Sequence, residues 1–210
     1  MTHPFELAQA SNPFFEIVRQ TPPAGAYLGL GVEHILLGID HLLFVLGLML
    51  LVPGTRRLVA TVTAFTIAHS VTLALAVLGV VNVPSGPVEA IIALSIFFVA
   101  AEIVLLRHGK GAMTARVPWI VAGTFGLLHG FGFAGAIAEV GLPHGDVPLA
   151  LLLFNLGVEA GQLAFIAVVL GVLSLARRLP THTPRWAGFA VPYAMGSIAL
   201  FWVLERCAAL

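Results

Sequence analysis

Cysteine is almost absent from this chain, because Cys207 is the only one among 210 residues. A single thiol excludes an intramolecular disulfide and any metal cluster that needs several cysteine ligands. Charge is also scarce, since Asp, Glu, Lys and Arg make 10% of the residues, compared with about 25% in an ordinary soluble domain. With a mean hydropathy of +1.02, the composition excludes such a domain and indicates a polytopic membrane protein.

A zinc-protease motif and the typical pattern of a signal peptide are also missing from the sequence. The chain contains no H-E-x-x-H, the zinc-binding motif of many metalloproteases. The first 25 residues include Glu6 and Glu16 and no long apolar run, so we expect no cleavable signal peptide. We assign residues 1–26 to an N-terminal segment at or outside the membrane surface, and residues 27–206 to a transmembrane domain.

Six apolar segments are each long enough to cross the hydrocarbon core of a bilayer, which takes about 20 helical residues. We expect these spans near residues 27–52, 57–82, 87–106, 117–140, 147–176 and 186–205. Arginine or lysine follows the first, third and fifth spans, whereas the loops after the second and fourth contain neither. By the positive-inside rule, the odd-numbered loops are cytoplasmic and both termini lie on the other side. The predicted fold is an all-α bundle of six transmembrane helices.

The first span contains four ionisable side chains, Glu33, His34, Asp40 and His41. One aspartate at the centre of a membrane helix costs roughly 2.5 to 3.5 kcal/mol on a translocon-type scale, so Asp40 needs a partner, a water-filled cavity or a cation. His34 and His41 share a face but lie about 10 Å apart along an unbroken helix. One ion bound at about 2 Å cannot contact both rings in that geometry. Either the helix opens near Gly38, or the histidines are successive stations on a path.

Imidazoles and carboxylates recur at the same depth in later spans. His69 lies in the second span, His129 in the fourth and Glu159 in the fifth, each near the middle of the hydrocarbon layer. Asn155, Glu159 and Gln162 are spaced i, i+4 and i+7, which makes one polar stripe on an apolar helix. Such groups usually face a cavity and carry protons, ions or substrate. Imidazole with carboxylate suits zinc, nickel, copper or iron rather than calcium.

Several of these groups also have a purely structural interpretation. The hydroxyls of Thr63, Thr66 and Ser70 share a face, and we expect them to bond back to carbonyls of their own helix or across to a neighbour. His69 could be a neutral imidazole bonded to one of these hydroxyls. A lone buried Glu159 could simply be protonated.

Two carboxylates lie near the ends of the third span. Glu89 is at its outer edge, where it could be a vestibule group that attracts cations or a first-turn residue favoured by the helix dipole. Glu102 is near the inner edge, and we expect it to snorkel toward the membrane surface or to pair with Arg107.

The first span carries a family resemblance. The run His34-Ile35-Leu36-Leu37-Gly38-Ile39-Asp40-His41 resembles the H-x5-D-H signature of the HupE/UreJ family, bacterial membrane proteins regarded as nickel permeases or accessories to nickel enzymes. The similarity extends over the whole membrane portion, including the stretches 63–70, 129–130 and 154–159. The resemblance implies that His34, Asp40 and His41 are ligands or transport residues.

The family's second signature, F-H-G-x-[AV]-H-G-x-E, is only partly met. His129 fits its second histidine and Gly126 its first glycine, while Phe125 and Gly132 stand at the positions of the other histidine and the glutamate. His69 and Glu159 are candidates to supply the missing ligands from other spans.

These observations favour a transporter over an enzyme, with a divalent transition-metal ion, nickel or zinc, as the bound metal. The expected metal site comprises His34, Asp40, His41, His69, His129 and Glu159, and the expected path adds Glu33, Glu89, Asn155 and Gln162. An intramembrane zinc hydrolase with an open coordination position is the alternative, and a metal sensor or metallochaperone is a third. We expect a bacterial inner-membrane protein whose partners are the metal ion and the bilayer, and no nucleic acid. Homo-oligomerisation stays open.

Overall fold

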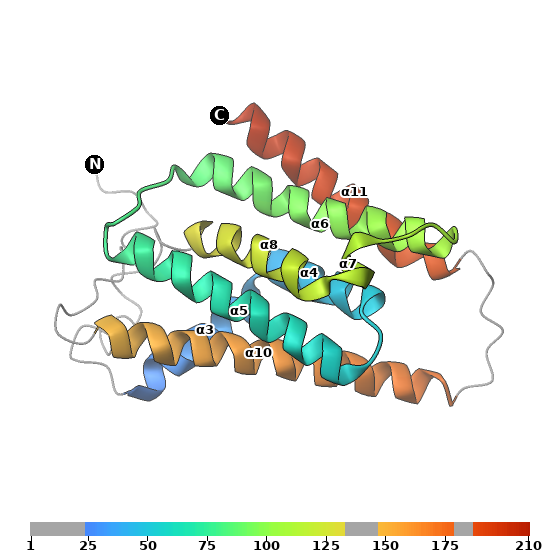
Figure 1. Ribbon diagram of the computed structural model, residues 1–210, viewed down its shortest axis with the longest axis horizontal. Coiled ribbons are helices and arrows are strands. Elements are labelled where there is room, and N and C mark those ends of the chain that lie inside the picture. The colour runs from blue at the N-terminus through green and yellow to red at the C-terminus, as the bar shows by residue number, and fades with distance from the viewer. Residues whose placement is uncertain (1–23, 133–146, 179–186) are drawn as a thin grey trace, which may run out of the picture.

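The computed structural model describes residues 24–132, 147–178 and 187–210, which form helices and their connections without any strand (Figure 1). The helices are α3 (Ala24–Leu37), α4 (Ile39–Leu51), α5 (Thr55–Val77), α6 (Ser85–Arg107), α7 (Met113–Arg116), α8 (Pro118–Gly132), α10 (Val147–Ala176) and α11 (Ala187–Ala208). The predicted all-α class is confirmed for this part of the chain. The predicted N-terminal segment lies almost entirely outside it.

Long apolar helices account for most of the bundle. By length and composition, α5, α6, α10 and residues Gly188–Ala208 of α11 can each cross a membrane. Helices α3 and α4 pass the same test only together, as one span bent by 72°. The predicted fourth span, 117–140, is described only as far as the end of α8. The chain is therefore a multi-pass membrane protein with four or five candidate spans among the described residues, and the total of six stays a prediction.

The two ends of the bundle differ in their connections. The α4–α5 connection and the C-terminal ends of α6 and α10 lie together at one end, whereas the α5–α6 connection and the C-terminus lie at the other (Figure 1). Arg56, Arg107 and Arg177 belong to the first group. This arrangement agrees with the alternation expected from the positive-inside rule. Which end faces the cytoplasm stays a prediction.

Glycine allows two helix pairs to pack at very short range. A Cβ atom on Gly31 of α3 would overlap the Phe154 carbonyl oxygen of α10. A Cβ atom on Gly130 of α8 would overlap the Thr72 hydroxyl and the His69 carbonyl oxygen of α5. Small residues that permit such approach are a common basis of helix association in membranes. The α3–α10 and α5–α8 pairs therefore set the spacing of the helices that carry the polar side chains.

The apolar interior consists of two clusters of buried side chains. The larger includes Phe44, Leu48 and Phe65, and the smaller includes Ile35 and Leu73. In sequence, His41 lies between Ile35 and Phe44, and His69 lies between Phe65 and Leu73. Each of these two histidines is therefore flanked along the chain by one member of each apolar cluster.

The predicted pairing of Glu102 with Arg107 is wrong. Glu102 is buried and accepts hydrogen bonds from the backbone N–H groups of Met113, at 2.5 Å, and Thr114, at 2.7 Å. The first N–H groups of a helix lack partners within it, so the carboxylate satisfies the start of α7. Arg107 instead lies over the Phe189 ring, 5.9 Å from its centroid. Glu102 is therefore a structural residue that holds α7 against α6.

Candidate metal site

The first predicted span is broken at Gly38. The axes of α3 and α4 differ by 72° there, and the ring centroids of His34 and His41 lie 4.7 Å apart. The Gly38 N–H donates to the His34 carbonyl at 2.9 Å, and the Leu42 N–H donates to the Gly38 carbonyl at 3.0 Å. Of the two interpretations of this sequence, the opened helix is the one found, and it turns two distant rings into neighbours.

Glycine is required at the break because of close contacts rather than an unusual backbone angle. Gly38 has φ −78° and ψ 89°, which other residues can also adopt. A Cβ atom there would lie 2.7 Å from the His34 carbonyl oxygen and 3.0 Å from Nδ1 of His41. Any side chain at position 38 would therefore push α3 and the His41 ring apart.

Three histidines from three helices form a group that could hold one metal ion. One ring nitrogen each from His34, His41 and His69 lies within 4.8 Å of the others. Two nitrogens that bind one ion at about 2.1 Å can be at most about 4.2 Å apart, so a small ring movement would bring all three into range. His129 of α8 is the next neighbour, with its ring centroid 5.1 Å from that of His41. We call these four residues the histidine cluster.

Three of the four rings are held by an oxygen acceptor at Nδ1. The contacts are His41 Nδ1 to Asp40 Oδ1 at 3.1 Å, His69 Nδ1 to Asn155 Oδ1 at 3.4 Å, and His129 Nδ1 to the Phe125 carbonyl at 2.8 Å. Because carbonyl and carboxylate oxygens only accept, each Nδ1 carries the proton and each Nε2 keeps its lone pair. The Asn155 amide is oriented by a bond from its Nδ2 to the Leu151 carbonyl, at 2.8 Å.

The opposite nitrogens of the same rings are ready to bind a ligand. Nε2 of His41, His69 and His129 is buried and has no hydrogen-bond partner among the described residues. Buried polar atoms are normally paired, so three such lone pairs in one place require an explanation. Histidines that bind metals commonly have one ring nitrogen on the metal and the other on a carboxylate or carbonyl oxygen. The donor set therefore fits a transition metal such as nickel or zinc.

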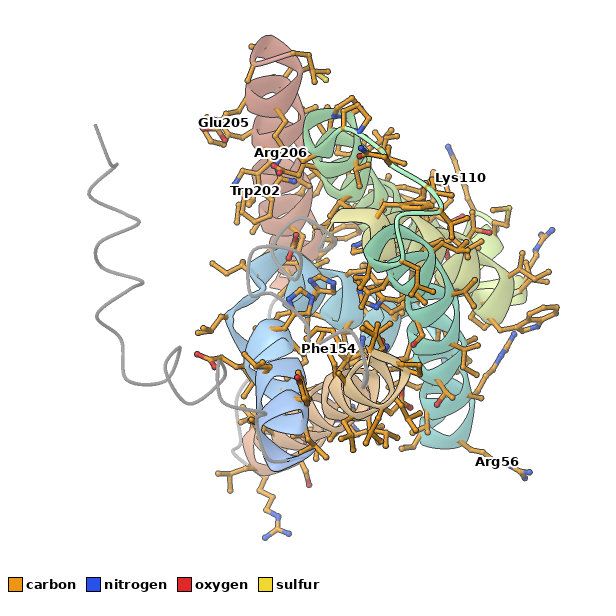
Figure 2. The ribbon with its side chains drawn as sticks, turned by 90° about the vertical axis from the view of Figure 1, so that its left-hand side faces the viewer. Arg56, Lys110, Phe154, Trp202, Glu205 and Arg206 are labelled. Atoms are coloured by element: carbon orange, nitrogen blue, oxygen red, sulfur yellow. The ribbon has the colours of Figure 1, made fainter. Side chains whose placement is uncertain are left out.

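Aromatic rings surround the histidine cluster. Phe65 stacks on His69 at 6.1 Å with an interplanar angle of 21°, Phe44 lies 5.5 Å from His129, and Phe154 lies 5.5 Å from His34. Phe154 projects into the middle of the bundle, whereas Arg56, Lys110 and Glu205 are at its periphery (Figure 2).

Such an apolar lining keeps water away from the histidines. Exclusion of water strengthens electrostatic interactions inside a site. Asp40 is bonded to His41 through its Oδ1, so this carboxylate places one negative charge beside the ring that has contacts with the other three.

The polar stripe of α10 faces α5. Asn155 contacts His69, the Thr63 hydroxyl donates to Glu159 Oε1 at 2.6 Å, and the Thr66 hydroxyl lies 2.8 Å from Gln162 Oε1. The stripe itself was predicted from spacing, but its partners on α5 were not. A matching signal existed, since Thr63 and Thr66 have the same i, i+3 spacing as Glu159 and Gln162. Glu159 lies outside the three-histidine group, and its metal contact stays a prediction.

The hydroxyl predictions have two different outcomes. Ser70 donates to the Thr66 carbonyl at 2.6 Å, and the threonines bond across to α10 as described above, so the expected back-bonding and cross-bonding are confirmed. The structural alternative for His69 is wrong, because its partner is the amide oxygen of Asn155 rather than a hydroxyl. The nearest hydroxyls on α5 have other partners, because Thr66 contacts Gln162 of α10 and Thr72 donates to a backbone carbonyl of its own helix.

The two remaining pathway candidates, Glu33 and Glu89, do not belong to the three-histidine group. Glu33 is exposed on α3. Glu89 Oε2 lies 3.6 Å from Arg206 Nε, and Arg206 Nη1 also donates to the Glu89 carbonyl at 2.7 Å. These contacts join the start of α6 to the end of α11. Their part in an ion path stays a prediction.

Comparison with known proteins places the chain in a family. The family described as "HupE / UreJ protein" matches residues 12–206, which include the whole histidine cluster. The chain belongs to the HupE/UreJ family. No curated protein and no solved structure matches it. Membership of the HupE/UreJ family points to transition-metal transport, and the donor set of the cluster agrees with that chemistry.

Proposed function

We propose that this HupE/UreJ protein transports a divalent transition-metal ion, of the nickel type, across the bacterial inner membrane. The ion is the cargo, and the histidine cluster is the site that receives it inside the bilayer. The observation that carries the proposal is the convergence of ring nitrogens from His34, His41 and His69 within 4.8 Å of one another. His129 is the fourth candidate ligand, and Asp40 holds the central His41 ring.

The broken span supports transport. Transporters often bind substrate where a helix is interrupted near the membrane midplane, because the interruption gives polar groups access to a cavity. In this chain the break at Gly38 separates His34 on α3 from His41 on α4. A change in the angle between these two helices would change the distance between two ligands. Such a change is a simple way to bind an ion and then release it.

The hydrolase alternative is not favoured. A zinc hydrolase needs a carboxylate that activates the metal-bound water. In the part of the chain that the structure describes, Asp40 is the carboxylate bonded to a cluster ring, and that bond occupies it in positioning His41. A metal sensor would bind the ion without moving it, so an uptake measurement separates this third possibility from transport.

The test measures binding and transport on the same purified protein. We expect wild type to bind about one nickel ion per chain and to take it up when reconstituted in liposomes. His69→Ala and His129→Ala remove candidate ligands, and Asp40→Asn removes the charge that holds His41, so each variant should weaken binding by about 10-fold to 100-fold or more. His108→Ala is the matched control, because His108 is exposed and its ring lies 5.2 Å from that of Phe189, outside the cluster.

The results discriminate among the possibilities. Binding without uptake would favour a sensor. If wild type binds no transition metal, or if the cluster variants equal His108→Ala, the proposal is wrong. Titration with nickel, cobalt and zinc in turn identifies the preferred ion.

A further inference from the structure

A second polar site lies between α5 and α10. Thr63 and Thr66 on α5 meet Glu159 and Gln162 on α10 through the two contacts of 2.6 and 2.8 Å. The two threonines are spaced i, i+3, and so are Glu159 and Gln162. The two contacts therefore lie about one helical turn apart on the facing surfaces of α5 and α10. Thr63 and Thr66 precede His69 by six and three residues, so this site extends from about 4.5 to about 9 Å along α5 from that histidine. The displacement is toward the end of α5 that carries Arg56.

Polar atoms at this second site lack partners. Glu159 Oε2 and Gln162 Nε2 are buried without a hydrogen bond among the described residues, and the Gln162 side chain is 0% exposed. The Thr66 hydroxyl also lies 3.2 Å from the Val62 carbonyl, and it has one proton to give. If that proton goes to Val62, the Gln162 amide can turn its N–H toward Thr66, which leaves its oxygen without a donor. In either orientation one end of this buried amide is unsatisfied.

The carboxylate of Glu159 also lacks a counter-charge. Among the described residues, the ion pairs are Asp40 with His41 and Glu89 with Arg206, and neither involves Glu159. Ionisable groups within membrane spans normally pair with an opposite charge or face a cavity that carries ions. The unpaired Oε2 of Glu159 is suited to bind a cation. The Gln162 amide can either donate its unpaired N–H to water on that cation or, in the flipped orientation, present its oxygen.

The donor atoms differ from those of the histidine cluster. The second site offers a carboxylate, two hydroxyls and an amide oxygen, and such hard oxygen donors bind magnesium and manganese types of ion in proteins. Ions of the nickel type bind imidazole more tightly than these oxygens. Conduction requires sites from which an ion can leave, so a weaker site after a tight one favours release.

We propose that Thr63, Thr66, Glu159 and Gln162 form a second station on the ion path, which accepts the partly hydrated divalent cation as it leaves the histidine cluster. This inference rests on the proposed function. It assigns to Glu159 an oxygen-donor site of its own, separate from the nitrogen donors of His34, His41, His69 and His129. Transport then proceeds in two steps, from nitrogen ligands to oxygen ligands, along the α5–α10 interface.

The experiment loads the two stations with different ions. Purified full-length protein is first given one equivalent of Zn²⁺, which fills the histidine cluster, and is then titrated with Mn²⁺ while electron paramagnetic resonance follows the free Mn²⁺ signal. We expect wild type to bind about one Mn²⁺ reversibly. Glu159→Gln keeps the size of the side chain but removes its charge, so it should weaken Mn²⁺ binding at least about tenfold. Its Zn²⁺ affinity should stay within twofold of wild type.

Three further variants serve as controls for Glu159→Gln. Glu205→Gln removes an exposed carboxylate at the periphery of α11 and should bind Mn²⁺ as wild type does (Figure 2). Thr63→Val retains the Glu159 carboxylate but removes its hydroxyl partner, and we expect a smaller loss of Mn²⁺ affinity. Glu159→Asp restores the charge and should recover part of the binding. Because Thr63→Val leaves every charge in place, it also tests the site if Glu159→Gln is too unstable to purify.

Uptake into liposomes completes the test. Glu159→Gln should lower nickel uptake at least about tenfold although the histidine cluster still binds, because the exit step is lost. Wild-type Mn²⁺ binding and uptake in both Glu159→Gln and Thr63→Val would overturn the second station and leave the proposed function standing. Loss of Zn²⁺ binding in Glu159→Gln would also overturn it, since Glu159 would then belong to the histidine cluster. A wild type that binds no Zn²⁺ or nickel contradicts the proposed function itself.

Discussion

The two polar sites of the bundle are built in different ways. The histidine cluster draws nitrogen donors from α3, α4, α5 and α8, and it exists because the first span is broken between two of those helices. The second station draws oxygen donors from α5 and α10, two continuous helices whose polar residues repeat in matching steps. The histidine cluster depends on a break in a helix, and the second station depends on the regular i, i+3 spacing along two unbroken helices.

This difference determines what a conformational change can do. Rotation of α3 relative to α4 about Gly38 changes the distance between His34 and His41, because the break lies between them. Glu159 and Thr63 lie on α10 and α5, and neither helix is broken between its polar residues. A hinge at Gly38 therefore lies within the set of ligands of the histidine cluster, whereas neither helix of the second station contains such a hinge.

Substitution at Gly38 should have the largest effect on this contrast. In Gly38→Ala the new Cβ atom meets the His34 carbonyl oxygen at 2.7 Å and Nδ1 of His41 at 3.0 Å. Alanine is also favoured over glycine in helices by about 1 kcal/mol, which promotes a continuous span with the two rings about 10 Å apart. We expect a loss of nickel affinity of about 100-fold, comparable to removing a ligand. Isothermal titration of the purified variant measures it.

A glycine of the same fold without close neighbours serves as the control. A Cβ atom on Gly123 of α8 would meet nothing within 4 Å. Gly123→Ala should therefore bind nickel as wild type does. Equal affinities in Gly38→Ala and Gly123→Ala would show that the break does not set the ligand geometry. Mn²⁺ binding at the second station should be unchanged in both variants.

Asn155 offers a test of how the rings are held, with a smaller expected effect. Its Oδ1 accepts from His69 Nδ1, so Asn155→Leu frees the ring to rotate or to move its proton to Nε2. Loss of such a supporting acceptor typically costs about 10-fold to 100-fold in metal affinity, and we expect the lower part of that range because the contact is long. Asn155→Asp keeps an acceptor and should recover most of the affinity. If Asn155→Leu and Asn155→Asp bind nickel equally, Asn155 has only a packing role.

The helices that carry the polar residues were predictable from the sequence, but the direction of each side chain was not. Counting along the predicted spans placed His69, His129 and Glu159 near the membrane midplane, and the structure has these residues in α5, α8 and α10. Rotation of each helix about its axis decides which neighbour a side chain meets. That rotation depends on glycine contacts such as Gly130 with α5, which link residues about 60 positions apart. Glu159 consequently meets Thr63 instead of joining the three-histidine group.

The break at Gly38 and the role of Glu102 show two other limits. Glycine in a helix is compatible with both a straight and an interrupted span, so position 38 alone could not decide between them. What decides is the lack of room at position 38, where a Cβ atom would meet both the His34 carbonyl oxygen and the His41 ring. Glu102 was assigned to Arg107 because the two are close in sequence. The structure instead brings the N-terminus of α7 next to Glu102, and its first N–H groups, which have no partner within the helix, donate to the carboxylate.

The smallest effect is expected at Glu89, which tests whether the path begins at a vestibule carboxylate. Its pairing with Arg206 offsets its charge and ties α6 to α11, so Glu89→Gln should leave nickel affinity and uptake within twofold of wild type. The ion pair is partly exposed and its charged atoms are 3.6 Å apart, and surface pairs contribute at most about 1 kcal/mol, so a thermal melt should show only a slight loss of stability. A large fall in uptake at low nickel concentration, with unchanged affinity at the histidine cluster, would instead make Glu89 an entry site. The contrast between two internal stations would then extend to three along the path.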